Sequence, residues 1–173
     1  MIFYPKMYLE NILEIKYEML EANGIKGIIL DMDNTLIDFH VNILNGVQQW
    51  VEDLKGKGIK LIIVSNSNKI EKLEKTSREL KIDYIKFGMK PLKKGLKKAQ
   101  KILQLKPENI AVAGDQLFTD IWGANRCKMF SILVKPLDEK DILLTIIKRP
   151  LENYIIKRYL KKINSKEKKN VHK

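Results

Sequence analysis

The sequence has little of what membrane proteins and disulfide-stabilised proteins need. Its one cysteine, Cys127, allows no intrachain disulfide, and a cysteine-rich zinc site is excluded. The longest apolar stretches, such as Ile142–Leu144, are far too short to span a bilayer. The first residues have no basic lead and no long apolar run, so we expect no signal peptide. These absences exclude an integral membrane protein and a secreted mini-protein, and they favour a cytoplasmic protein.

What the chain does have is enough length for one domain and a basic excess at one end. Its 173 residues include 33 Lys and Arg against 21 Asp and Glu, a net charge of +12. Residues 148–173 carry ten basic and two acidic residues, so +8 of that charge lies there. We expect one domain over 1–150 with a motif-bearing core at 26–134, a basic amphipathic helix at 151–163, and a disordered basic tail at 164–173.

Short apolar runs predict a parallel sheet. They are rich in β-branched residues and do not alternate with polar residues, which is typical of strands covered on both faces. Helical patterns separate them, at about 45–56, 68–80, 92–104 and 117–127. This alternation predicts an open, doubly wound α/β sheet. The runs are Gly27–Asp31, Ile59–Ser65, Tyr84–Phe87, Ile110–Gly114 and Phe130–Val134.

Two further helices are expected outside this unit. An apolar stripe over Tyr8, Ile12, Ile15 and Met19 predicts an N-terminal helix that ends near Asn23. At the other end, an apolar arc lies opposite a basic arc, so the helix could dock on the outer layer of the sheet or lie on an anionic membrane surface. The apolar arc consists of Ile155, Ile156, Tyr159, Leu160 and Ile163.

Polar residues follow the predicted strands at the edge where a doubly wound sheet binds its ligands. Carboxylates gathered there would repel one another unless a cation neutralised them, and oxygen ligands favour a hard ion such as Mg²⁺. One carboxylate could attack a phosphoryl group while a second protonates the leaving oxygen. Asp120 could instead cap a helix, and Lys90 could be one more solvated lysine. The residues are Asp31, Asp33, Thr35, Ser65, Asn66, Lys90, Asp115 and Asp120.

The order DMDNT, strand-end Ser, Lys and GDxxxxD resembles the four motifs of haloacid dehalogenase (HAD) superfamily phosphatases. The resemblance implies a HAD-like fold in which Asp31 is the nucleophile and Asp33 the general acid and base, with the Asp33 carbonyl on Mg²⁺. Thr35 would brace the loop and, with Ser65 and Asn66, bind the phosphoryl group. Lys90 would stabilise that group, Asp115 would ligate Mg²⁺, and Asp120 would ligate it or orient bound water.

A finer similarity points to the YqeG-like branch of subfamily IIIA. It rests on GIKGIILDMDNTL, VSNS, KP and AGDQLFTDIWGANRCKMFSILVKPL. Relatives of that branch include mitochondrial phosphatases acting on phosphatidylglycerophosphate, so a large or surface-bound phosphate ester is the implied substrate. The gaps between motifs are too short for a cap domain, which leaves the site open to such a substrate.

Two other functions stay open. A regulatory protein of this fold could bind a protein or RNA partner through its basic tail, with weak or secondary catalysis. Charge alone favours a nucleic-acid end phosphatase, but no interleaved aromatic and basic platform supports one. The sequence also leaves open a homo-oligomer and a peripheral position at the inner membrane surface.

Overall fold

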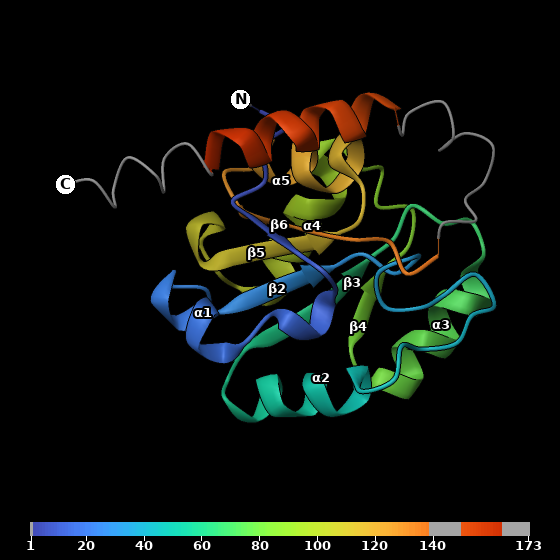
Figure 1. Cartoon of the computed structure of the whole chain (residues 1–173). Helices are drawn as coiled ribbons and strands as arrows, with labels where there is room; N and C mark the ends of the chain where they lie inside the picture. Colours follow the sequence, from blue (N-terminus) through green and yellow to red (C-terminus); the bar gives the residue numbers. More distant parts are fainter. Residues whose placement is uncertain (1, 139–149, 164–173) are drawn as a thin grey trace.

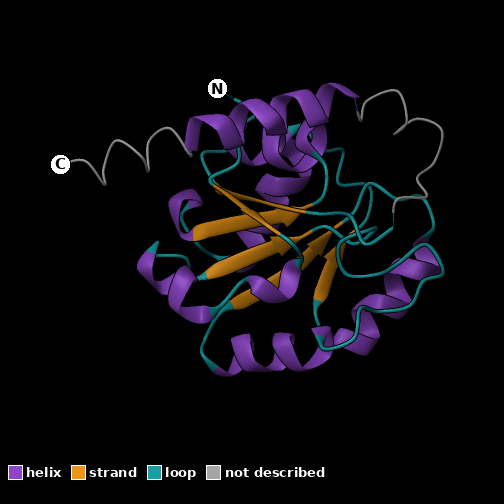
Figure 2. Cartoon of the chain, viewed as in Figure 1, coloured by secondary structure: helices purple, strands orange, loops and turns teal. Residues whose placement is uncertain are grey.

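Six parallel strands form one sheet at the centre of the molecule (Figure 2). The computed structural model describes residues 2–138 and 150–163. The sheet order is β1-β6-β5-β2-β3-β4, which confirms the predicted doubly wound α/β class and adds one strand to the five expected. The strands are β1 Met7–Leu9, β2 Gly27–Leu30, β3 Lys60–Val64, β4 Asp83–Ile85, β5 Ile110–Gly114 and β6 Phe130–Val134.

Helices cover both faces of this sheet (Figure 1). On one face lie α1 to α3, and on the other lie α4, α5 and a C-terminal helix over 150–163. The α-helices are α1 Tyr17–Ala22, α2 Val47–Gly56, α3 Ile70–Leu80, α4 Lys93–Leu103 and α5 Trp122–Arg126. Shorter turns are the 3₁₀ helices η1 Ile12–Glu14 and η2 Pro107–Asn109, and a π-helical turn, η3, at Leu117–Ile121.

The central strands β2 and β5 are apolar throughout because each of their faces meets a separate helical layer. In β2, Ile28 and Leu30 belong to the core cluster on the α1–α3 side, while Ile29 between them belongs to the cluster beneath α4 and α5. All three side chains are fully buried. Successive side chains of a strand point to opposite faces, so burial on both sides removes the polar alternation of a half-exposed strand.

The predicted N-terminal helix is wrong over most of its length. Residues Met7–Leu9 instead form β1, which pairs in parallel with β6 from Met7 opposite Ile132 to Leu9 opposite Val134. The chain then makes the 3₁₀ turn η1, whose first turn is capped by the Asn11 side chain. Ile12 and Ile15 of the stripe are still buried, and Tyr8 and Met19 are partly buried, because strand, turn and short helix all lie on the core.

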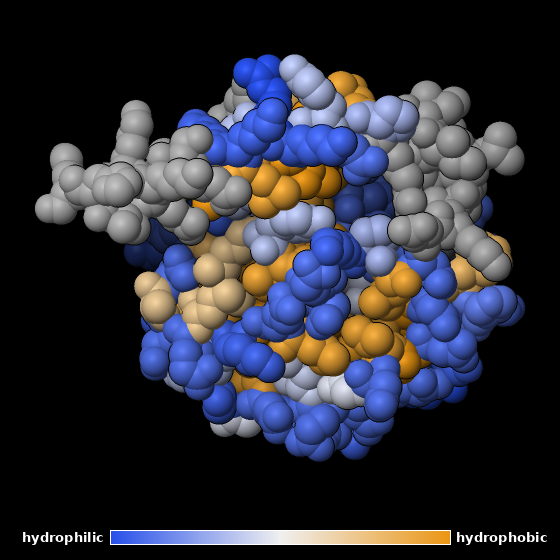
Figure 3. Space-filling view, viewed as in Figure 1, coloured by the Kyte–Doolittle hydropathy of each residue, from blue (hydrophilic) through white to orange (hydrophobic). Residues whose placement is uncertain are grey.

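The C-terminal helix packs on the layer formed by η3 and β6. Ile155 and Ile156 contact the cluster of Leu117, Ile121 and Leu133, and a buried Glu152 accepts hydrogen bonds from two main-chain N–H groups of η3. Docking is therefore the alternative seen here, although Leu160 of the predicted apolar arc is exposed. Most of the surface of this helix is hydrophilic in the space-filling view, with apolar surface beneath it (Figure 3). The tail at 164–173 lies outside the described residues.

The segments between the motifs hold no cap domain. Between Asp33 and Ser65 the chain forms a loop, α2 and β3, and between Asn66 and Lys90 it forms α3, β4 and their connections. Both segments are described throughout. Among the described residues, no helix combines the length and apolar character that crossing a membrane requires.

Candidate active site

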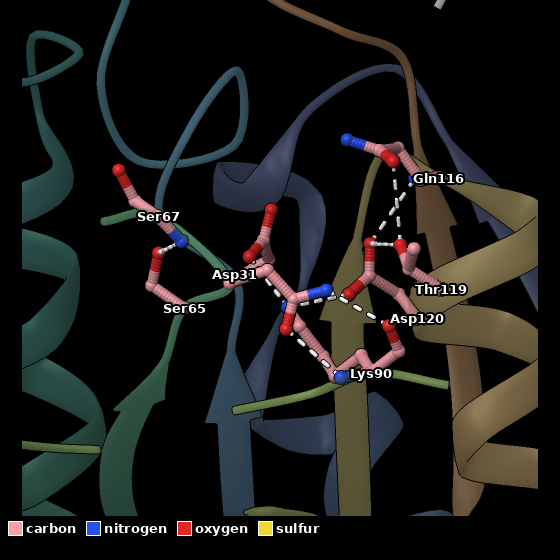
Figure 4. A network of polar contacts seen from close by, with 8 residues as sticks. Asp31, Ser65, Ser67, Lys90, Gln116, Thr119 and Asp120 are labelled. Atoms are coloured by element: carbon pink, nitrogen blue, oxygen red, sulfur yellow. Dashed lines mark hydrogen bonds and ion pairs between the residues drawn. The ribbon is translucent and has the colours of Figure 1, made fainter. Parts of the chain in front are cut away.

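A buried lysine lies between two buried aspartates at the carboxyl edge of the sheet (Figure 4). The Nζ atom of Lys90 is 2.5 Å from Oδ1 of Asp31 and 2.6 Å from Oδ1 of Asp120. Asp31 directly follows β2, Asp120 lies in η3 after β5, and Lys90 follows β4. The three strands therefore bring together residues up to 89 positions apart in the sequence. This excludes the alternatives that Lys90 is solvated and that Asp120 is only a helix cap.

Asp115 joins the two aspartates to make an acidic cluster that fits a divalent cation. One carboxylate oxygen from each of Asp31, Asp115 and Asp120 lies within 4.8 Å of the others. Three carboxylates face one lysine, and carboxylate oxygens are the ligands that hard divalent ions prefer. The cluster does not include the Asp33 carboxylate, so the expected contribution of Asp33 remains its main-chain carbonyl.

Burial sets the protonation of this cluster in the absence of a cation. It raises the pKa of the Asp31 carboxyl to about 7, an effect that Lys90 opposes and the Asp120 carboxylate reinforces. Burial alone would lower the pKa of Lys90, but the charges of Asp120 and Asp31 outweigh it and raise that pKa. A bound cation would favour the ionised form of Asp31 by neutralising nearby negative charge.

The backbone around Asp120 is shaped to admit its carboxylate. A Cβ atom on Gly114 would lie 2.4 Å from the carboxyl carbon of Asp120, so only glycine leaves the room. The π-helical geometry of η3 places Asp120 so that its Oδ2 accepts from the Gln116 N–H at 3.2 Å and from the Thr119 hydroxyl at 3.4 Å. Single π-helical turns of this kind are frequent at functional sites. Gln116 and Thr119 therefore hold a site carboxylate in place.

The side chain of Asn66 has a different partner from the one expected. Its Nδ2 donates to the Lys90 carbonyl and its Oδ1 accepts from the Lys90 N–H, both at 2.8 Å. This two-point contact fixes the main chain that carries the buried lysine. Asn66 thus positions Lys90, and its contact with the phosphoryl group stays a prediction.

Ser65 and Thr35 are the two buried hydroxyl residues expected at the phosphoryl group. Ser65 follows β3, is fully buried, and accepts a hydrogen bond from the Ser67 N–H at 3.0 Å. The Thr35 hydroxyl is also buried and has no hydrogen-bond partner among the described residues. The expected bracing hydrogen bond from Thr35 is thus not seen. Buried hydroxyls usually bond to protein, water or ligand, and the phosphate contact of Thr35 stays a prediction.

Asp33 lies outside the acidic cluster and pairs with a residue that the sequence did not single out. Its Oδ1 forms an ion pair with Nζ of Lys72 in α3, and the Asp33 side chain is 38% exposed. Lys72 is one of many lysines at helical spacing, so no sequence signal separates it from a solvated one. Its pairing with Asp33 becomes visible only in the structure, where α3 packs against the loop after β2.

Comparison with known proteins identifies the family to which this chain belongs. The family model described as mitochondrial PGP phosphatase matches residues 1–137. The chain belongs to that family. It is 37% identical over 155 residues to a probable phosphatase, YqeG, of Bacillus subtilis, covering 89% of this chain and 90% of that protein. A chloroplastic/mitochondrial phosphatidylglycerophosphate phosphatase 1 of Arabidopsis thaliana is 26% identical over 91% of this chain but only 48% of its own length.

Solved structures show the same fold. An uncharacterised protein from Listeria monocytogenes matches with a TM-score of 0.54 and 23% identity, over 69% of this chain and 86% of that one. A putative 3-deoxy-D-manno-octulosonate 8-phosphate phosphatase from Vibrio cholerae matches with a TM-score of 0.51 and 16% identity, over 68% and 79%. The predicted relationship to YqeG and to mitochondrial phosphatidylglycerophosphate phosphatases is confirmed, and the protein is a phosphatase that hydrolyses phosphoric monoesters.

Proposed function

We propose that this chain is a Mg²⁺-dependent phosphatase that works through an aspartyl-phosphate on Asp31. The observation that carries the proposal is the buried contact of Asp31 and Asp120 with Lys90, beside Asp115. Asp31, Asp115 and Asp120, with the Asp33 carbonyl, would hold Mg²⁺. The ion, when bound, would offset charge on the phosphoryl oxygens.

The residues of the chain divide the reaction into two steps. The Asp31 carboxylate attacks phosphorus, the bond to the leaving oxygen breaks, and Asp33 gives that oxygen its proton. A water then attacks the phosphorus, Asp33 takes a proton from it, and phosphate leaves as the Asp31 carboxylate is restored. Lys90 and the hydroxyls of Ser65 and Thr35 bind the phosphoryl oxygens in both steps.

A large or surface-bound phosphate ester such as phosphatidylglycerophosphate is the substrate that we favour. The related Arabidopsis protein is named for that substrate, and the capless site leaves room for a bulky ester. Apolar side chains also flank Lys90 along the chain, with Phe87, Met89 and Leu92 about half exposed. Exposed apolar side chains beside a polar site suit a substrate that joins a phosphate to an apolar body. Contact of the C-terminal helix with anionic lipid, oligomer formation and a cytoplasmic location stay predictions.

Metal removal tests the proposal. Hydrolysis of p-nitrophenyl phosphate and of phosphatidylglycerophosphate in mixed micelles should fall to background in excess EDTA and return when excess Mg²⁺ is added. The reason is that the acidic cluster cannot hold a phosphate dianion without a cation to neutralise it. Zn²⁺ should restore little activity, because the cluster offers oxygen ligands alone. Full activity in excess EDTA would contradict the proposed metal site.

A further inference from the structure

A pocket of about 470 Å³ opens beside the proposed acid, between the loop at Val41 and the start of α3. One lining residue connects it to the active site, because the Nζ of Lys72 pairs with the Asp33 carboxylate. The pocket therefore borders the side of the site where a proton would be delivered. Its lining residues are Val41, Asn68, Lys69, Ile70, Glu71 and Lys72.

The direction of proton transfer places the alcohol half of the ester on this side. For Asp33 to protonate the leaving oxygen, that oxygen must come within hydrogen-bond reach of the Asp33 carboxyl. In the proposed function, the phosphoryl group would bind at Asp31 and Lys90, which pair with each other and not with Lys72. The carbon skeleton attached to the leaving oxygen then extends past Asp33 towards Lys72 and the pocket.

The lining of the pocket combines positive charge with apolar walls. Lys72 has three N–H donors, and its ion pair with Asp33 uses one of them. Its side chain is only 15% exposed, so it is held in place more firmly than a surface lysine. Lys69 adds a second positive charge and Glu71 one negative charge, and both side chains are exposed to solvent, while Ile70 supplies apolar surface. The two lysines thus outnumber the one carboxylate of the lining.

Backbone strain at the opposite wall supports a functional role for the pocket. Val41 has a φ of +67°, a left-handed conformation that is a genuine outlier for a β-branched residue. Strained residues of this kind cluster at ligand-binding sites, where the surrounding structure holds them in place. Here the Val41 N–H donates to the Asp38 carbonyl at 3.1 Å, and Asp38 in turn accepts from Asn42.

We propose that this pocket binds the alcohol half of the phosphate ester, and that Lys69 and Lys72 select an alcohol that carries a second negative charge. The substrates so favoured are phosphate monoesters whose alcohol bears a carboxylate or a phosphodiester. The inference rests on the proposed function, because it needs Asp33 to act on the leaving oxygen. Lys69 and Lys72 are thus specificity-determining residues of the same site.

A matched pair of substrates tests this inference. In 3-phosphoglycerate and glycerol 3-phosphate the phosphate sits on the same three-carbon skeleton, and a carboxylate in the first replaces a hydroxymethyl group in the second. The wild-type protein should have the higher kcat/KM for 3-phosphoglycerate. Lys69→Met and Lys72→Met should each lower the ratio of the two kcat/KM values by about fivefold to tenfold, since each removes a charge-assisted contact.

The ratio separates specificity from catalysis. Lys72→Met also removes the partner of Asp33, which would change kcat for both esters alike and cancel in the ratio. Lys75→Met is the matched control, because Lys75 lies on α3 outside the pocket and pairs with Glu79; its ratio should equal that of the wild type. If Lys69→Met and Lys72→Met hydrolysed both esters with the wild-type ratio of kcat/KM values, the inference about the pocket would be overturned and the proposed function would stand. Wild-type protein that hydrolysed no ester with Mg²⁺ would overturn the proposed function as well.

Discussion

Replacing Asp31 by asparagine should lower kcat by at least about a thousandfold while the protein stays folded. The amide has nearly the same shape as the carboxylate but cannot supply the attacking anion, and losing a covalent nucleophile costs several orders of magnitude. Stability should fall much less than on loss of Lys90, because burial raises the pKa of Asp31 to about 7 and disfavours its charged form, and because Lys90 keeps Asp120 as an ion-pair partner. Steady-state kinetics with Mg²⁺ and urea denaturation measure the two effects.

The control for this variant is Asp53→Asn, which changes an exposed carboxylate on α2. It should have wild-type kcat, so that a loss confined to Asp31→Asn reports on the active site. If Asp31→Asn kept more than about a hundredth of the wild-type kcat, Asp31 would not be a covalent nucleophile.

Lys90→Met should both disable the site and destabilise the fold. The Lys90 side chain is 2% exposed between the side chains of Asp31 and Asp120, which are 8% and 0% exposed. Removing one partner of a buried ion pair typically costs about 3–5 kcal/mol, because it leaves uncompensated charge in the interior. We expect a comparable loss in the free energy of unfolding without Mg²⁺, and a kcat at least about a hundredfold lower with Mg²⁺.

Added Mg²⁺ distinguishes uncompensated buried charge from a simple packing defect as the cause of the lost stability. A cation at the acidic cluster would replace part of the lost positive charge, so Mg²⁺ should raise the Tm of Lys90→Met more than the Tm of the wild type. Lys94→Met, on the exposed face of α4, should match the wild type in both measurements. A Lys90→Met protein as stable as the wild type without Mg²⁺ would show that the buried ion pair does not support the fold.

The sequence predicts the parts of the site that follow strands directly. Asp31, Ser65 and Asp115 come at the ends of β2, β3 and β5, and the rule that parallel strands end at one edge of the sheet brings them together. Lys72 could not be found in this way, because its role depends on how α3 packs against a loop. The same holds for Glu152, whose contact with η3 depends on where the C-terminal helix docks.

The N-terminal segment shows where periodicity misleads. The stripe from Tyr8 to Met19 has helical spacing, yet its first part pairs with the edge of β6. An open sheet edge offers a row of unpaired main-chain N–H and C=O groups. No pattern within residues 7–9 indicates that these residues will pair with that edge. Tertiary pairing here overrides a local signal, as it often does for short segments.

The most direct test of the account is to find the phosphoryl group on the protein. An Asp33→Asn variant, mixed with p-nitrophenyl phosphate and Mg²⁺, needs no acid to expel so good a leaving group but lacks the base that helps water to attack. Acid quenching followed by peptide mass spectrometry should find the added phosphoryl mass on Asp31, and none in a variant that also carries Asp31→Asn. A phosphoryl group on another residue, or a hydrolysing protein on which none is ever trapped, would contradict the account.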